Sequence, residues 1–252
     1  MVVRRSAPKC ARLLLVGLAL PVSISCSAPP RPVWLHADAS EWPALQERLV
    51  EVRDARPRDP WAAVVHVTMR APRTGHVEDG RGAIAIAPGR AVRMILVGGA
   101  GFTLLDAWVS RDRWRIAVPP ANVVRRGGAS DDPDDLPVGF LRWWFFTPLE
   151  GALFAAARTD SGMLWLLHDA DAVIELLETP CSGGRLLAVT RRAHGRSETV
   201  RECRGRVARA GDWVEYGDAA SGLGIRLVVE SVASEVPHDG AFGDPDDAPG
   251  GT

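Results

Sequence analysis

The sequence predicts a mainly β protein, an antiparallel sheet with one N-terminal helix and one apolar helix in mid-chain. From residue 61 onward, apolar and polar residues alternate with a period of two in short runs. A few turn-forming residues separate these runs, as is typical of an antiparallel meander. A helical period occurs in only two segments, at 40–57 and within 136–151.

The first of these segments carries the signals of a helix start and a helix end. Ser40 can act as the N-cap, and Pro43 fits the first turn. Apolar residues recur at helical spacing at Leu45, Leu49 and Val52. Pro57 ends the helix, and the period then changes to that of a strand.

About eleven or twelve strands follow. The predicted ranges are 61–71, 82–87, 91–97, 102–110, 114–119, 152–158, 162–169, 171–178, 185–193, 197–203, 212–218 and 224–232. The alternation is clearest near residue 114, where Trp114, Ile116 and Val118 face one side and Arg113 and Arg115 the other. One face of the sheet is therefore expected to be apolar and the other solvated.

The segment LPVGFLRWWFFTPLEG, residues 136–151, interrupts the strands. Pro137 and Pro148 bracket it and leave room for about three helical turns. Aromatic side chains at helical spacing, together with their apolar neighbours, make the helix apolar nearly all round. These residues are Phe140, Leu141, Trp143, Trp144 and Phe145. Such a helix is either a plain core helix or a lid over an apolar cavity.

The N-terminus has the pattern of an export signal. A basic start with Arg4, Arg5, Lys9 and Arg12 precedes an uncharged apolar run at 13–25, which is too short to span a bilayer. Small residues then lead directly to Cys26. This junction resembles the lipobox of bacterial lipoprotein precursors, although Ser23 stands where the usual leucine would be. The resemblance implies that residues 1–25 are a signal peptide and that Cys26 is lipidated and anchors the protein to the outer membrane, facing the periplasm.

Two further cysteines remain for the exported domain, because Cys10 lies within the signal. Cys181 and Cys203 are 22 positions apart beside strand-like segments. In an oxidising compartment a disulfide between them is favoured over two free buried thiols.

Composition defines the remaining boundaries. Residues 26–39 form a Pro-rich linker, 40–234 suit one domain, and the acidic, Gly- and Pro-rich residues 235–252 are expected to be a disordered tail. Without residues 1–25, which hold four of the 30 basic residues, 26 basic residues face 31 acidic ones. This balance does not favour nucleic acid as a partner, and we expect a monomer.

The order of elements resembles the LolA/LolB-like lipoprotein-localisation proteins of Gram-negative bacteria. The motif-level similarity lies in GAIAIAPGRAVRMILVGGAGFTLLDAWVSRDRWRIAVPP, residues 82–120: a small-residue strand, Pro-x-x-x-Arg, an apolar strand, a Gly turn, another strand and a short charged hairpin. The resemblance implies an unclosed antiparallel β-barrel of about eleven strands, with the N-terminal helix and a mid-chain lid helix over its hydrophobic concave face. Met94 replaces the family's aromatic residue, and the compact GGAGF at 98–102 replaces a protruding loop, which puts receptor activity in doubt.

The resemblance also implies a ligand class and a site. The partners would be acyl chains of lipids or lipoproteins, bound in an apolar cavity, and Arg93 would contact the lid. The residues expected to line the cavity or lid are Met94, Leu96, Leu104, Trp108, Trp114, Ile116, Phe140, Leu141, Trp144 and Phe145. The alternative is an envelope lipoprotein of related fold with a structural or protein-interaction role, its cavity filled by its own side chains.

Catalytic motifs are not recognisable in the sequence. It has no G-x-S-x-G, H-E-x-x-H or P-loop pattern, and its six histidines are scattered. We therefore expect no enzyme activity, no cofactor and no metal site.

Overall fold

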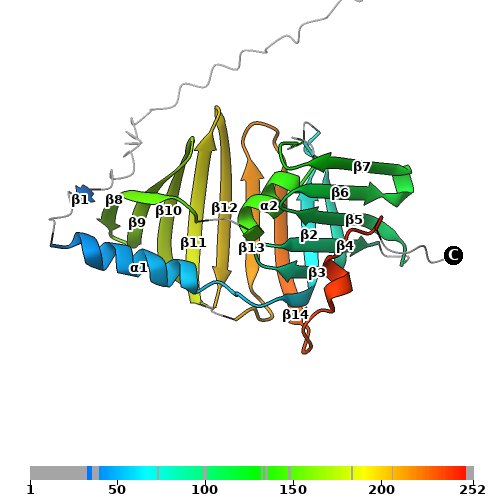
Figure 1. Ribbon diagram of the computed structural model, residues 1–252, viewed down its shortest axis with the longest axis horizontal. Coiled ribbons are helices and arrows are strands. Elements are labelled where there is room, and N and C mark those ends of the chain that lie inside the picture. Colours follow the sequence, from blue (N-terminus) through cyan, green and yellow to red (C-terminus); the bar gives the residue numbers. More distant parts are fainter. Residues whose placement is uncertain are drawn as a thin grey trace, which may run out of the picture. The chain divides into compact units, whose positions relative to one another are not determined.

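The computed structural model describes residues 33–35, 40–72, 74–98, 101–131, 133, 136–146, 149–182, 184–205 and 207–247. The predicted signal peptide (residues 1–25), the predicted lipidation site Cys26 and residues 248–252 lie outside this part of the chain. Fourteen strands form one sheet in which every pairing is antiparallel (Figure 1). The strands are β1 (Val33–Leu35), β2 (Trp61–Arg70), β3 (Val77–Ala87), β4 (Ala91–Val97), β5 (Thr103–Ser110), β6 (Arg113–Val118), β7 (Val123–Gly128), β8 (Ala152–Thr159), β9 (Gly162–Asp169), β10 (Ala172–Cys181), β11 (Gly184–Ala193), β12 (Arg196–Arg204), β13 (Trp213–Asp218) and β14 (Gly224–Val232).

The sheet is built from two meanders. Strands β2 to β7 pair in chain order, as do β8 to β14, and the pairing of β14 with β2 joins the two sets. Strands β1 and β7 are the two ends of the sheet and do not pair with one another among the described residues. The sheet is therefore an unclosed antiparallel barrel, as predicted, but with more strands than expected.

Helix α1 (Trp42–Asp54) precedes the first meander, and helix α2 (Val138–Phe146) connects the two. Pro43 stands in the first turn of α1, and Leu45, Leu49 and Val52 are buried, which confirms the predicted helix. The capping prediction is wrong, because Glu41 holds the N-cap position and makes no capping hydrogen bond through its side chain. Among the described residues, no helix is long and apolar enough to cross a membrane.

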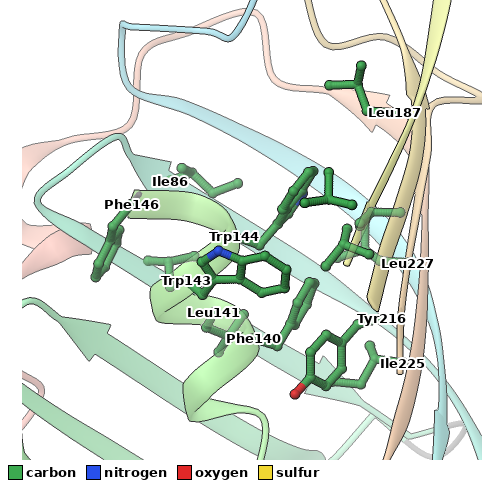
Figure 2. Packing of buried hydrophobic residues seen from close by; sticks show 14 of the residues in the cluster. Ile86, Phe140, Leu141, Trp143, Trp144, Phe146, Leu187, Tyr216, Ile225 and Leu227 are labelled. Atoms are coloured by element: carbon green, nitrogen blue, oxygen red, sulfur yellow. The ribbon is translucent and has the colours of Figure 1, made fainter. Parts of the chain in front are cut away.

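The main core lies on the sheet face that carries α1 and α2, here called the inner face. Side chains from both helices and both meanders form this one cluster, among them Leu49, Val65, Ile84, Met94, Phe140, Trp144, Trp165, Ile174, Val200 and Leu227 (Figure 2). The opposite face is called the outer face. It carries most of the charged side chains and, over β3 to β6, the C-terminal segment.

The sequence prediction missed the two edge strands. β1 lies within the expected linker and pairs with β8. β7, with the sequence VVRRGG, has consecutive valines and consecutive arginines, so it lacks the alternation of a half-buried strand. Its pairing with β6, rather than burial of its side chains, makes it a strand.

The prediction of a disordered tail is wrong for residues 235–247. Residues Asp239–Phe242 form a short 3-10 helix, η2, and Phe242 is buried against Ala87 and Ala91. The prediction rested on composition, which does not show specific contacts. One aromatic residue anchors this segment, and its acidic residues pair with arginines of the sheet.

The disulfide is confirmed. Cys181 at the end of β10 and Cys203 on β12 are bonded, with their Cα atoms 6.3 Å apart. The bond connects two strands that both pair with β11, so it fixes one end of the second meander.

Replacing both cysteines by serine is expected to lower the free energy of unfolding by about 3 kcal/mol, because the bond closes a loop over a 22-residue separation and restricts the unfolded chain. Urea unfolding of the oxidised protein and of the double variant measures the difference. The wild-type protein reduced with dithiothreitol is the control for the new hydroxyl groups. A loss below about 1 kcal/mol in both samples would contradict the estimate.

Candidate functional site

Helix α2 occupies the middle of the inner face. Six of its side chains are buried, namely Val138, Phe140, Leu141, Trp143, Trp144 and Phe146. They pack on sheet residues that include Ile86, Tyr216, Ile225 and Leu227 (Figure 2). The mid-chain segment is therefore a helix in the core, as its apolar circumference predicted.

One cluster of charged residues holds the C-terminal half of α2. The Arg56 guanidinium stacks on the Trp144 ring at 4.3 Å from its centroid and donates a hydrogen bond of 2.8 Å to the Trp144 carbonyl. Trp144 Nε1 in turn donates to Glu202 at 2.9 Å, and Glu202 pairs with both Arg56 and Arg204 at 3.2 and 3.0 Å. Arg56, Trp144, Glu202 and Arg204 are called the Glu202 cluster.

The charges of the Glu202 cluster depend on one another because the site is buried. Glu202 is only 3% exposed. Burial lowers the pKa of Arg56 to about 9, although Glu202 acts to raise it. The guanidinium therefore remains charged at neutral pH, and its charge is balanced by the Glu202 carboxylate, which also accepts the hydrogen bond from Trp144 Nε1.

A second cluster holds the preceding turns of α2. Arg191 donates to Glu198 at 3.0 Å and lies 5.9 Å from the centroid of the Trp143 ring. The Tyr216 hydroxyl donates to the same carboxylate at 2.8 Å, and the Tyr216 ring packs on Phe140 with centroids 4.9 Å apart. These five residues are called the Glu198 cluster. Burial, reinforced by Glu198, raises the pKa of Tyr216, so its hydroxyl stays a donor.

Strand β12 presents both carboxylates to α2. Glu198, Val200 and Glu202 share the inner face because side chains two positions apart on a strand point the same way. At about 3.3 Å per residue, the two carboxylates are anchored about 13 Å apart along the strand. A buried carboxylate is unfavourable unless it is paired. Glu202 therefore holds Arg56 and Trp144 of α2 directly, whereas Glu198 holds Arg191 and Tyr216, which in turn contact α2.

Little free space remains beneath the helix. A cavity of about 40 Å³ is lined by residues that include Trp144, Phe145, Ile84 and Leu227. Pockets for drug-sized ligands typically measure about 300–1,000 Å³. A larger cleft of about 360 Å³ lies beside α1, but charged residues such as Arg56, Arg185 and Glu202 line it. In this state, the protein's own side chains fill the apolar interior.

The structure brings together most of the residues predicted to line a cavity or lid. Those buried in the main core are Met94, Leu96, Trp114, Ile116, Phe140, Leu141 and Trp144. Leu104 and Phe145 are partly buried and pack against the same core.

Two predicted site residues lie on the outer face instead. Trp108 stands opposite Arg93 and Arg115 in the strand register, whereas its neighbour Val109 stands opposite Trp114. Residues directly opposite one another share a face, so Trp108 points away from the cavity. Arg93 does not reach α2, because its guanidinium pairs with Asp106 on the adjacent strand at 3.1 Å.

Sequence reasoning missed the charged partners of α2. Glu198, Val200 and Glu202 alternate with Thr199 and Arg201, and the apolar residue at the centre of this set signals the buried side. The partner arginines give no such signal, because Arg56 follows a helix and Arg191 lies in a polar run.

Glu202→Gln is expected to lower the free energy of unfolding by about 3 kcal/mol, because Arg56 and Arg204 lose their buried counter-charge. Chemical denaturation measures the change. Glu215→Gln is the matched control: Glu215 pairs with Arg226 at 3.0 Å, but both side chains are more exposed, so we expect a change within about 0.5 kcal/mol. Equal effects of the two substitutions would contradict the structural role of the Glu202 cluster.

Comparison with known proteins gives similarities in structure alone. No protein-family model matches the sequence, and no curated protein sequence matches it significantly. The chain is similar to a LolA superfamily protein from Nitrosomonas europaea, with 13% identity, coverage of 79% of this chain and 97% of that one, and a TM-score of 0.48. A DUF1329 family protein from Desulfovibrio piger has 11% identity, 80% and 96% coverage and a TM-score of 0.47. A putative outer membrane lipoprotein-sorting protein domain from Vibrio parahaemolyticus has 8% identity, 77% and 94% coverage and a TM-score of 0.43. Since all three TM-scores lie below 0.5, function has to be argued from the residues of this chain.

Proposed function

We propose that this protein is a lipid-anchored envelope lipoprotein that binds acyl chains on the inner face of its sheet when helix α2 moves aside. It would be anchored through Cys26 at the outer membrane, facing the periplasm. The bound acyl chains would belong to lipids or to other lipoproteins. The role is binding or transfer and requires no catalytic step.

The observation that carries this proposal is the position of α2. The helix is apolar on nearly every side, yet it belongs to neither meander and covers the inner face as a separate element. Its removal would uncover buried aliphatic side chains of the sheet, such as Ile86, Ile225 and Leu227. An acyl chain could replace the helix on this surface, because apolar burial contributes about 25 cal/mol per Å² and needs little directional chemistry.

The two carboxylate clusters would then act as a latch on α2. They contact the helix through the side chains of Phe140, Trp143 and Trp144 and through one carbonyl, so strands need not separate for it to leave. If the helix leaves, Arg56 and Arg191 keep Glu202 and Glu198 as partners. No buried charge would be left uncompensated, which keeps the displaced state accessible.

A second candidate is a structural or protein-interaction role with no cargo. The small volume of the remaining cavity, about 40 Å³, favours it. In that case α2 is a permanent part of the core, and its clusters serve stability alone.

Weakening the latch distinguishes these two functions. If only displaced molecules bind acyl chains, the apparent affinity rises about tenfold for each 1.4 kcal/mol by which α2 is destabilised. Trp143→Leu removes the contact between the Trp143 ring and Arg191, which exists only while α2 lies on the sheet, so this variant is expected to bind dansyl-undecanoic acid more tightly than the wild type does. Fluorescence titration of the chain lacking residues 1–26 measures the affinity.

Two control variants test the specificity of that effect. Glu215→Gln changes a carboxylate that pairs on the outer face and should not change the affinity. Leu164→Ala destabilises a buried position outside the main core, so it tests whether general loss of stability is enough. If no variant binds acyl probes, including the variant in which α2 is destabilised, the acyl-binding proposal is wrong and the structural role is favoured.

The membrane anchor has its own test. In cells fed an alkyne-tagged palmitate, the wild-type protein is expected to incorporate the label, whereas Cys26→Ser should not, because the thiol that carries the lipid is lost. Separation of inner and outer membranes then locates the labelled protein. Labelling of the serine variant to the wild-type level would show that Cys26 is not the lipidation site.

A further inference from the structure

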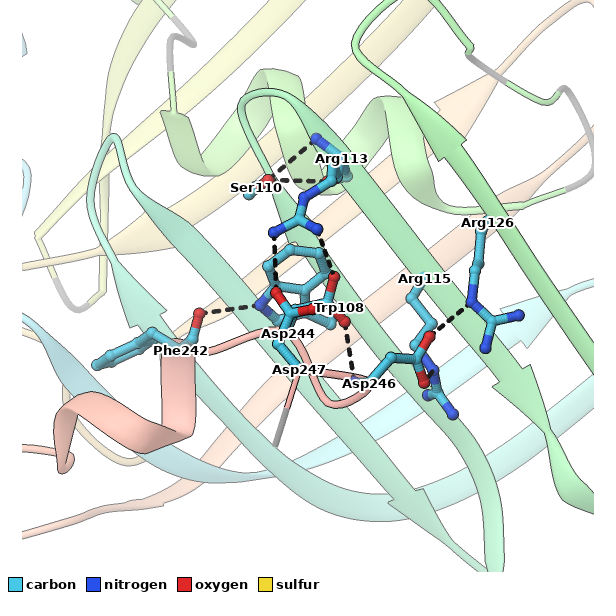
Figure 3. Close-up of polar contacts among 9 residues, drawn as sticks. All are labelled: Trp108, Ser110, Arg113, Arg115, Arg126, Phe242, Asp244, Asp246 and Asp247. Carbon is cyan, nitrogen blue, oxygen red and sulfur yellow. Dashed lines mark hydrogen bonds and ion pairs between the residues drawn. The ribbon is translucent and has the colours of Figure 1, made fainter. Parts of the chain in front are cut away.

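The C-terminal segment, residues 239–247, crosses the outer face of the first meander (Figure 3). Phe242 is 3% exposed and packs against Ala87 and Ala91, whose small side chains leave room for its ring. The Trp108 indole donates a hydrogen bond of 3.0 Å to the Phe242 carbonyl. The segment is therefore seated by one aromatic anchor and one backbone contact.

Beside this anchor, β4 to β7 carry a row of cationic and aromatic residues. Arg93, Trp108, Arg115 and Arg126 stand directly opposite one another in the strand registers. Like charges in that arrangement, here Arg115 and Arg126, destabilise a pair of strands unless an anion lies between them. Asp246 is that anion: it accepts from Arg115 at 2.9 Å and from Arg126 at 2.6 Å.

A third arginine, Arg113, pairs with two more acidic residues of the segment, while Asp239 pairs with Arg90. Arg113 pairs with Asp244 at 3.3 Å and with Asp247 at 3.2 Å. Its guanidinium lies 5.7 Å from the centroid of the Trp108 ring. Together, Trp108, Arg113, Arg115 and Arg126 are called the arginine–tryptophan surface, and its spacing fits the sequence Phe-Gly-Asp-Pro-Asp-Asp at 242–247.

The segment is attached in a way that allows it to leave. Residues 233–236, which connect it to β14, are exposed, and Val236 is 70% exposed. The side chains of Arg113 and Arg126 are 58% and 57% exposed, and ion pairs at such exposure contribute little to stability. Arg115 and Asp244 are more buried, at 16% and 11%, so they and Phe242 account for most of the attachment. Of the residues after 232, those that the structure describes contribute nothing to the main core, so the inner face does not depend on the segment.

We propose that the arginine–tryptophan surface is a docking site for a partner protein, which it binds through an acidic peptide segment that bears a phenylalanine. The chain's own C-terminal segment occupies this site as a tethered competitor. Two contacts indicate that the ligand of this surface is a peptide. Trp108 donates its hydrogen bond to a backbone carbonyl, and Phe242 fills an apolar recess. The surface thus recognises main chain and side chain as well as negative charge.

The tether explains how a weak contact can keep the site closed. A short flexible linker holds a segment at an effective concentration in the millimolar range. A partner segment of equal intrinsic affinity would therefore be excluded, whereas a tighter or multivalent one would displace the tail. This inference concerns the outer face and is independent of acyl binding on the inner face.

The test releases the tail without removing it. In the full chain from residue 27 onward, Phe242→Ala with Asp244→Asn and Asp246→Asn removes the anchor and two charges. A fluorescein-labelled peptide of residues 238–247 is then titrated in anisotropy experiments. We expect the released variant to bind the peptide about tenfold or more tightly than the wild type does. Changing Phe242 to alanine within the peptide should reverse the gain.

The surface itself has matched controls. In the released background, Arg113→Gln with Arg126→Gln should weaken peptide binding about tenfold, whereas Arg226→Gln, another exposed arginine, should not. Circular dichroism confirms that each variant is folded. A folded released variant that does not bind the peptide overturns the proposal.

Two further results would also overturn it. One is binding of the released variant to phosphatidylglycerol vesicles but not to the peptide, which would assign the surface to anionic lipid. The other is a dimer of the wild type, seen by light scattering and lost in the released variant, which would assign the occupant to a second copy of the chain.

Discussion

The pairing of the buried carboxylates on β12 is the constraint on which the interior depends. Glu198 and Glu202 stand on the apolar face of a strand, where an unpaired charge would be strongly unfavourable. Each is satisfied by an arginine and by a hydrogen-bond donor from an aromatic side chain. Because Arg56 comes from the end of α1 and Trp144 from α2, the Glu202 cluster joins both helices to the sheet. The register of α2 on the inner face follows from these contacts more than from its apolar surface, which is nearly the same on every side.

Both faces of the sheet combine arginine, tryptophan and carboxylate side chains, but these contacts differ in burial and therefore in strength. On the inner face, arginine stacks on tryptophan above a buried carboxylate, and the contacts fix a helix in the core. On the outer face, arginine and tryptophan meet carboxylates of a segment that is largely exposed. Burial separates the two cases: ion pairs inside are costly to break, whereas those outside are exchangeable. The chain thus combines interior ion pairs that stay intact with surface ion pairs whose acidic partner can be exchanged.

Local pattern predicted the fold well and the site only in part. Twelve strands and both helices follow from periodicity, because each has one face in the core and therefore a regular apolar spacing. β7 has no buried side chain to impose such a spacing, and the C-terminal segment is ordered by a single residue, Phe242. The side of Trp108 could not be predicted for a similar reason. Residues of β5 clearly alternate between two faces, but the register with β4 and β6 decides which face is the inner one. Partners such as Arg56 and Glu202, 146 positions apart, are set by tertiary structure alone.

The junction between β14 and β2 has a consequence for the order of folding. Val65 and Val229 are register partners although 164 positions separate them in the chain. Closing so long a loop is entropically slow, and folding rates fall as such non-local contacts accumulate. Either meander can form hairpins from neighbouring strands, but β2 keeps an unpaired edge until the last strand has arrived. Any chain of this topology that is synthesised or translocated N-terminus first would therefore hold an open, aggregation-prone edge on β2 until β14 has arrived, so this edge needs protection during that time.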